Sequence, residues 1–277
     1  MTRERFTIRQ STISQWMSCS LQAKFGMDYP EVRVQNAAAT FGTCIHHALE
    51  LYNTGASCEE AIESFLHAWD HPESLNAVPT VWPKYSSYGA YRSSGIEIIK
   101  NLHEKLLWEH REVVAAEHHF TVPFGEFALT GTVDLVEKRQ NASGKTILRI
   151  VDYKTNKKQP TLIALQNNIQ FTTYVYASMQ PEFWDSIDPD NSFELNLNFP
   201  RRGIWYQLGN SREIDVGPRD SSDFERLYMA CVQIKKAIDN EVFIPNISGD
   251  SCNFCSYKQQ CGIKIPDPEL EDLERWI

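Results

Sequence analysis

The chain has 277 residues, of which 42% are hydrophobic and 23% are charged, a balance typical of ordinary globular proteins rather than disordered or fibrous ones. Its N-terminus, MTRERFTIRQ, lacks the apolar core of a signal peptide, and no apolar run approaches the ~18 residues of a membrane span. A net charge of −9 argues against indiscriminate nucleic-acid binding, although a local basic groove or bound metal ions would still accept phosphate. We therefore expect a cytoplasmic protein whose seven cysteines are thiols or metal ligands rather than disulfides.

Helical periodicity dominates the first part of the chain. Ser11 is predicted to cap a first helix, and apolar residues at helical spacing predict a second helix over 40–53. Ser57 and Glu60 have the spacing of a capping box, which indicates the start of a third helix. A long fourth helix is expected over 86–112. These helices together predict a helical N-terminal region.

The periodicity then changes from helical to alternating. Three successive strands are predicted over 113–124, 127–138 and 146–155, and a crossover helix over 161–179. A hairpin of the strands 192–199 and 203–208 is predicted around Pro200-Arg201-Arg202, and a last helix over 219–240. This order of elements indicates an α/β (or α+β) fold with a central mixed β-sheet flanked by helices.

The stretch TILRIVDYKTNKKQ carries polar residues where an interior strand should carry apolar ones. Asp152 and Lys154 are two residues apart, so a strand points both side chains to the same face. Asp134 stands near the end of the preceding strand, and pairing of the two strands would bring the two carboxylates together. Such carboxylates repel each other unless a cation lies between them, and Mg²⁺ is held by one or two carboxylates with water and phosphate. The alternative is an ordinary ion pair at a strand end.

Four short motifs follow one another along the chain. FGTCIHHALE contains Gly42 and His46 at Gly-x-x-x-His spacing, and GTVDLV, IVDYKT and QFTTY follow it. Together they resemble the PD-(D/E)XK nuclease superfamily and, more narrowly, its RecB-like branch, over nearly the whole chain. Val133 stands where the superfamily's name has proline, as is common in that branch. The resemblance implies a restriction-endonuclease-like core.

The resemblance also implies a metal site. It makes Asp134, Asp152 and the main-chain carbonyl of Tyr153 ligands of Mg²⁺ or Mn²⁺, and it makes His46 a nitrogen ligand from a helix. Taken alone, each residue has a plainer interpretation, since histidines on helices are usually solvated or satisfied in the core. The ordered set of motifs favours the metal site.

Other positions take supporting roles in the same resemblance. Lys154 corresponds to the catalytic lysine, and Gln170 and Tyr174 match the pair that contacts nucleic acid and supports the active centre. Glu117, on the preceding strand, is a further supporting candidate. Four basic residues are candidates for a phosphate track, although such residues in turns more often only face solvent: Lys157, Lys158, Arg201 and Arg202.

The cysteines form a second constellation. Cys252, Cys255 and Cys261 make a C-x2-C-x5-C cluster, with Cys19 as its predicted fourth member. This distribution resembles the iron–sulfur subgroup of the RecB-like branch, which includes CRISPR-associated iron–sulfur exonucleases and the AddB nuclease domain. Four thiolates suit a [4Fe–4S] cluster or zinc, and the family likeness favours the cluster. Either metal would clasp the N-terminal helical region to the C-terminus.

One integrated domain with three parts is expected: a helical region (1–112), a nuclease core (113–245) and a cysteine cluster with an acidic tail (246–277). The resemblance implies a metal-dependent DNA exonuclease that hydrolyses phosphodiester bonds of single strands or duplex ends, 5′→3′ by analogy with the iron–sulfur relatives. It also implies a role in recombination, repair or DNA processing, with recombination or helicase proteins as partners. The rival interpretation is a non-catalytic DNA-end-binding or assembly subunit, and RNA is an alternative substrate.

Overall fold

The computed structural model describes residues 5–75, 80–81, 87–156, 158–187, 199–247, 252 and 255–262. Residues 192–198 of the predicted hairpin, Lys157 and the acidic tail from residue 263 lie outside these ranges. Within them, no helix is both long enough and apolar enough to cross a membrane.

A short strand, β1 (Phe6–Arg9), precedes the predicted first helix and pairs in parallel with the central strand β5 (Phe127–Gln140). Its four residues are too few for alternation to be recognised in the sequence. Arg9 occupies the N-cap position of the first helix, so the prediction of Ser11 as the cap was wrong; the strand runs into the helix without a loop. The helical segments that follow are α1 (Gln10–Ser18), α2 (Ser20–Asp28) and η1 (Pro30–Val32).

Three longer helices follow, close to the predicted positions. The hydroxyl of Ser57 accepts the N–H of Glu60 at 3.1 Å, and the Glu60 carboxylate accepts the N–H of Ser57 at 2.7 Å, which confirms the predicted capping box. The last of the three ends at Leu106 rather than at residue 112, because Glu112 already begins a long strand. The elements of this region are α3 (Ala37–Asn53), α4 (Cys58–Asp70) and α5 (Tyr88–Leu106), with η2 (Pro72–Leu75) and two short paired strands, β2 (Gln35–Asn36) and β3 (Thr80–Val81).

The central sheet is mixed. Its order is β1-β5-β6-β7-β8, and β4 pairs with the other edge of β5. β1 and β6 share one edge of β5, with β1 beside residues 127–130 and β6 beside residues 135–140. The β1–β5 and β6–β7 pairs are parallel, and the other pairs are antiparallel. The remaining strands are β4 (Glu112–Phe124), β6 (Thr146–Lys154), β7 (Arg201–Gln207) and β8 (Arg212–Asp215).

Two predicted elements differ from the structure. The single helix expected over 161–179 is two helices, because the side chain of Asn168 accepts the main-chain N–H groups of Gln170 and Phe171 and so caps a new helix. Arg201 and Arg202 lie in β7 rather than in a hairpin turn, and the described partners of β7 are β6 and β8. The two helices that replace the predicted one are α6 (Leu162–Gln166) and α7 (Ile169–Ala177). The remaining helices are η3 (Pro181–Phe183), η4 (Leu208–Asn210), α8 (Ser221–Asp239) and α10 (Lys258–Cys261).

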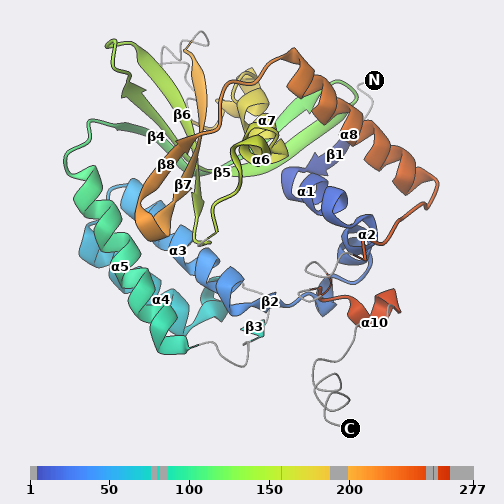
Figure 1. Cartoon of the computed structure of the whole chain (residues 1–277), viewed down its shortest axis with the longest axis horizontal. Helices are drawn as coiled ribbons and strands as arrows, with labels where there is room; N and C mark the ends of the chain where they lie inside the picture. Colours follow the sequence, from blue (N-terminus) through green and yellow to red (C-terminus); the bar gives the residue numbers. More distant parts are fainter. Residues whose placement is uncertain are drawn as a thin grey trace.

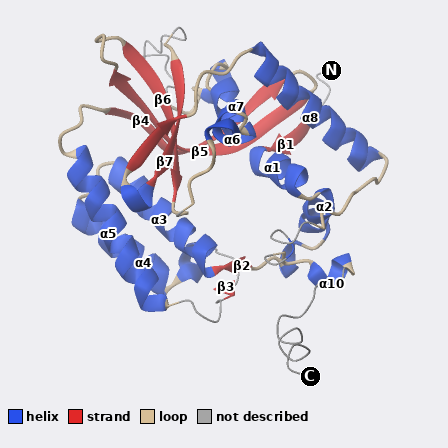
Figure 2. Ribbon diagram, viewed as in Figure 1, coloured by secondary structure: helices blue, strands red, loops and turns tan. Residues whose placement is uncertain are grey.

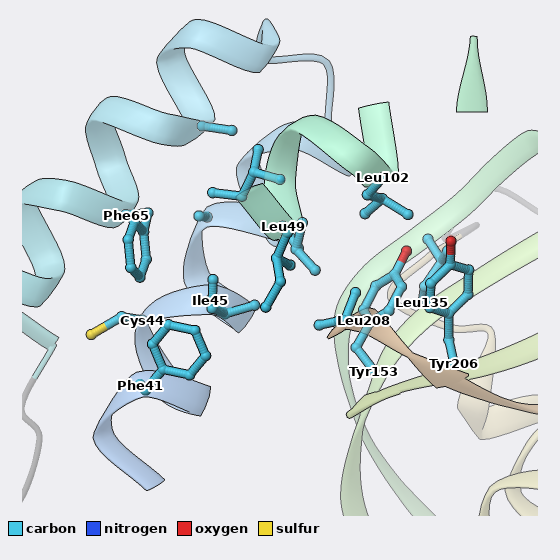
Figure 3. Packing of buried hydrophobic residues seen from close by; sticks show 14 of the residues in the cluster. Phe41, Cys44, Ile45, Leu49, Phe65, Leu102, Leu135, Tyr153, Tyr206 and Leu208 are labelled. Carbon is cyan, nitrogen blue, oxygen red and sulfur yellow. The ribbon is translucent and has the colours of Figure 1, made fainter. Parts of the chain in front are cut away.

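The buried apolar residues form two main clusters on opposite faces of the curled sheet. On one face, α3, α4 and α5 pack on β5, β6 and β7 through residues such as Leu49, Leu135 and Tyr153 (Figure 3). On the other face, α1, α7 and α8 cover β1, β4 and β5 through Ile13 and Leu227. Figure 1 and Figure 2 show these two helical groups on either side of the sheet. The fold is therefore mixed α/β, with a curled mixed sheet between helices.

Candidate active site

Asp134 and Asp152 lie just beyond the last paired residues of β5 and β6, at one end of this strand pair. Leu135 and Val151 are the last pair between the two strands, and Asp134 and Asp152 lie next to them. The exposed fraction of Asp134 is 8% and that of Asp152 is 1%, so both carboxylates are withdrawn from bulk water. The main-chain N–H of Tyr153 donates to Oδ2 of Asp134 at 2.6 Å. The structure thus brings together the two aspartates that strand pairing was expected to juxtapose.

The alternation of β5 breaks at Asp134. Val133 and Val136 belong to one cluster, whereas Leu135 packs on the opposite face beside α3. Asp134, which meets a side chain of α3, and Leu135 therefore point to the same side although they are consecutive. On β4, Glu117 lies between the residues that pair with Leu135 and Val133, and it has a φ of +43°, a left-handed conformation uncommon for a residue with a side chain. This irregularity places the Glu117 and Asp134 carboxylates on one side.

α3 brings a histidine to these two carboxylates. The side chain of Asn36 caps the helix, and His46 lies well inside it. Nδ1 of His46 is 3.3 Å from Oε1 of Glu117 and 3.5 Å from Oδ1 of Asp134, and its Nε2 is 3.1 Å from the carbonyl oxygen of Tyr153. Burial opposes protonation of His46, but Asp134 and Glu117 outweigh it and hold the pKa of this imidazole well above its usual value.

These residues form a group with the chemistry of a cation site. The ligand atoms of His46, Glu117 and Asp134 all lie within 4.8 Å of one another, and we call these three residues the metal-ligand group. Burial opposes ionisation of Asp134, but His46 and Lys154, with the hydrogen bond from Tyr153, keep the pKa of this carboxyl below its usual value. Two carboxylates, an imidazole and a nearby main-chain carbonyl fit Mg²⁺ or Mn²⁺.

A lysine completes the charged centre. Nζ of Lys154 lies 2.5 Å from Oδ2 of Asp152 and 3.4 Å from Oε1 of Gln170. Gln170 in turn donates to the hydroxyl of Tyr174 at 2.8 Å, one turn further along α7. Burial raises the pKa of Asp152 to about 6, although Lys154 opposes this rise. Burial also opposes protonation of Lys154, but Asp152 and Asp134 raise its pKa above the usual value.

Sequence reasoning missed one residue at this centre. Trp205 on β7 pairs with Asp152 in the register, and Nζ of Lys154 lies 5.6 Å from the centroid of its ring. An ammonium group at this distance over an indole is attracted to its face. No motif marks Trp205, because only the parallel pairing of β6 with β7 brings it beside Asp152.

Arg201 and Arg202, two of the basic residues expected along a phosphate track, lie away from this centre. Arg201 and Arg202 pair with residues four and three positions before Asp152 on β6, which is about 10–13 Å along the strand. The guanidinium of Arg201 donates to the carbonyl oxygen and the hydroxyl of Ser178 at the end of α7, both at 3.0 Å. Lys158 is exposed in the segment after β6. Arg201 is therefore held by the protein's own acceptors.

The four predicted cysteine ligands line one small cavity of about 30 Å³, together with Phe25 and Asn246: Cys19, Cys252, Cys255 and Cys261. Main-chain N–H groups point at two of the sulfurs, from Asn246 to Cys19 Sγ and from Tyr257 to Cys255 Sγ, each at 3.4 Å. Burial, and then the neighbouring thiols, raise the pKa of Cys255. Cys19 and the segment from Cys252 to Cys261 meet here although they are far apart in the sequence, and four thiols with amide donors to sulfur suit a bound metal centre.

Comparison with known proteins places the chain in a family. A model of the PD-(D/E)XK nuclease superfamily matches residues 8–262. The chain belongs to this superfamily. No curated protein matches it in sequence. Among solved structures, the PD-(D/E)XK protein is similar to SSO0001 (12% identity, TM-score 0.40, 96% of this chain and 90% of that chain covered). It is also similar to a protein from Eubacterium rectale named "Putative exonuclease" (12% identity, TM-score 0.45, 95% and 90% covered).

Proposed function

We propose that this PD-(D/E)XK protein is a metal-dependent DNA exonuclease of the RecB-like branch, acting 5′→3′ on single strands or duplex ends in recombination, repair or DNA processing. The observation that carries the proposal is the metal-ligand group beside the Asp152–Lys154 pair. A purely structural ion pair would not need three further ligand-type side chains gathered from α3, β4 and β5. Withdrawal of both aspartates from water also suits electrostatic catalysis.

The residues of the site have different roles in this reaction. His46, Glu117 and Asp134, together with the adjacent Asp152 and the carbonyl oxygen of Tyr153, would hold Mg²⁺ or Mn²⁺, which polarises the phosphate and activates water when bound. Lys154 places a positive charge beside the phosphate, where negative charge increases in the transition state. The amide of Gln170 and the ring of Trp205 limit the positions that the ammonium group takes, because both interact with it.

We further propose a [4Fe–4S] cluster at the four cysteines. The four thiols line one small cavity, and main-chain N–H groups are directed at two of the sulfurs, which supports this proposal. Anaerobically purified protein should be brown and contain iron and sulfide; colourless protein with stoichiometric zinc would contradict the cluster.

The nuclease proposal is tested with 5′-labelled and 3′-labelled oligonucleotides in the presence of Mg²⁺ or Mn²⁺. Lys154→Ala and His46→Ala should each reduce cleavage by a factor of about 10² or more. His47→Ala is the matched control, because His47 is the adjacent helix residue and pairs loosely with Glu50 at 3.9 Å. Wild-type protein that binds DNA without cutting it would support the non-catalytic alternative, and full activity in both site variants would refute the assigned residues.

A further inference from the structure

One face of the sheet, next to the metal-ligand group, bears exposed side chains. In the part formed by β1, β5 and β4, Ile8, Phe120 and Leu129 point under α1, α7 and α8. The alternate residues of the same strands point the other way. Three of them are exposed and two are half-buried: Arg9, His119, Thr121, Thr130 and Thr132. We call these five residues the open strand face.

The residues of the open strand face form rows of paired residues across neighbouring strands, and successive rows lie further from the metal-ligand group. His119 pairs with Thr132 in the row two residues beyond Glu117. Thr121 pairs with Thr130 in the next row, where Arg9 pairs with Thr130 from the other edge. Because a strand advances ~3.3 Å per residue, the rows lie about 6.7 Å and about 13 Å from the metal-ligand group. Successive phosphates of an extended nucleic-acid strand are separated by a similar step.

Arg9 and His119 are the donors that this face leaves to a ligand. The hydroxyl of Thr121 donates to Thr130 at 3.2 Å, and Thr130 donates to the carbonyl oxygen of residue 120 at 2.8 Å, so these hydroxyls are used internally. Nδ1 of His119 lies 2.7 Å from Oγ1 of Thr132. When Thr132 donates to Nδ1, the proton of the imidazole is on Nε2, which donates outward. Arg9 forms no ion pair with any residue in the described ranges.

The composition of the face fits a sugar–phosphate backbone. It carries one guanidinium, one imidazole and three hydroxyls, and no carboxylate, although the whole chain has a net charge of −9. Contacts to phosphate position a nucleic acid without reading its sequence. The five residues include no Phe, Tyr or Trp on which a base would stack. The face therefore suits phosphates rather than bases.

We propose that the open strand face binds the backbone of the DNA strand beside the bond that is cut. His119 contacts the first phosphate beyond the metal-ligand group, and Arg9 contacts the second. This inference rests on the proposed nuclease function and adds to it the path of the substrate strand. Binding is independent of sequence, and Thr132 acts as a positioning residue by holding the imidazole of His119.

The test measures the affinity of fluorescent oligothymidylate by anisotropy over a range of salt concentrations, with Ca²⁺ in place of Mg²⁺. Arg9→Gln should weaken binding about five- to tenfold at 50 mM salt and reduce the slope of log K against log salt by about 0.7, the value for one contact to a single strand. Arg9→Lys should retain the slope. His119→Val should weaken binding, because it removes a hydrogen-bond donor to phosphate.

Arg226→Gln is the matched control. Arg226 is an exposed arginine of α8, paired with Asp223, and its loss changes the net charge equally. An equal fall in salt slope for Arg226→Gln and Arg9→Gln, or unchanged binding in both Arg9→Gln and His119→Val, would overturn the open strand face as a binding site.

A small substrate separates this inference from the proposed function. Bis(p-nitrophenyl) phosphate has no second phosphate for the open strand face to bind, so its hydrolysis by the wild type with Mn²⁺ tests the proposed nuclease site alone. Wild-type protein that neither cleaves nor binds oligonucleotide would refute both proposals. Wild-type cleavage together with unaltered oligonucleotide binding by the variants would refute the open strand face alone.

Discussion

The left-handed backbone of Glu117 predicts an inverted order of stability for two substitutions. At a φ of +43°, a residue with a Cβ is less stable than glycine by roughly 1–2 kcal/mol. In an ordinary strand the order is opposite, and glycine is less stable than alanine by roughly 0.5–1 kcal/mol. Glu117→Gly and Glu117→Ala remove the same carboxylate, so their difference isolates the backbone. We expect Glu117→Gly to have the larger free energy of unfolding, by about 1 kcal/mol.

The assay is urea unfolding of both variants in EDTA, so that metal binding does not contribute. A difference of about 1 kcal/mol corresponds to roughly 2–4 °C in Tm for a chain of this size. Thr121, an exposed residue of the same strand that is not among the positive-φ residues, is the control. Thr121→Gly should be less stable than Thr121→Ala.

A Glu117→Gly variant less stable than Glu117→Ala would show that this backbone is not strained, and the reasoning would fail. The expected result would mean that the protein gives up stability to place a carboxylate beside His46 and Asp134, since glycine fits the backbone better but supplies no ligand.

Three further predictions concern stability, pH and metal. Gly95→Ala puts a Cβ 2.0 Å from the ring of Phe65, so urea unfolding should show a loss of about 1–3 kcal/mol; an unchanged midpoint would contradict this close packing of α5 on α4. Burial opposes ionisation of Glu213, but the charge of Arg149 and its neighbouring cations outweighs burial and lowers the pKa of this carboxyl from 4.5. The stability that the ionised Glu213 contributes is therefore complete above pH 4.5 and is lost as the pH falls through the lower pKa of the folded state. Glu213→Gln should flatten the fall in the free energy of unfolding below pH 5, and an unchanged pH profile would contradict this. After EDTA treatment, added Mn²⁺ should raise the Tm of wild type in a concentration-dependent way but not that of His46→Ala, and an equal rise in both would exclude His46 as a ligand.

Much of the site follows from local spacing. The alternation in β6 and the short turn between β5 and β6 are sufficient to place Asp152 and Asp134 at one end of a strand pair. Helical spacing in α3 leaves His46 on the face that meets them. These inferences work because each depends on periodicity within one element or on a pairing of neighbours in the chain.

The rest depends on contacts between distant segments or on departures from periodicity. The apolar stripe of residues 161–179 suggested one helix, but capping by Asn168 divided it. Regular alternation would put Asp134 and Leu135 on opposite faces, and nothing in the sequence marks the break opposite Glu117. Trp205 reaches the site only through a parallel pairing across a long connection. Such features arise from packing in the whole fold.

The cysteine segment restrains the helix that carries His46. The hydroxyl of Ser256 accepts the N–H of Val34 at 3.2 Å and donates to its carbonyl oxygen at 3.0 Å, two residues before the cap of α3. His46 reaches the sheet from a helix, so its position depends on packing and on this restraint, whereas the aspartates are fixed by strand pairing. We therefore expect Ser256→Ala to weaken Mn²⁺ binding by up to about tenfold, measured by calorimetry. Ser222→Ala, at an exposed position in α8, is the control, and equal Mn²⁺ affinity in the two variants would show that the strands alone define the site.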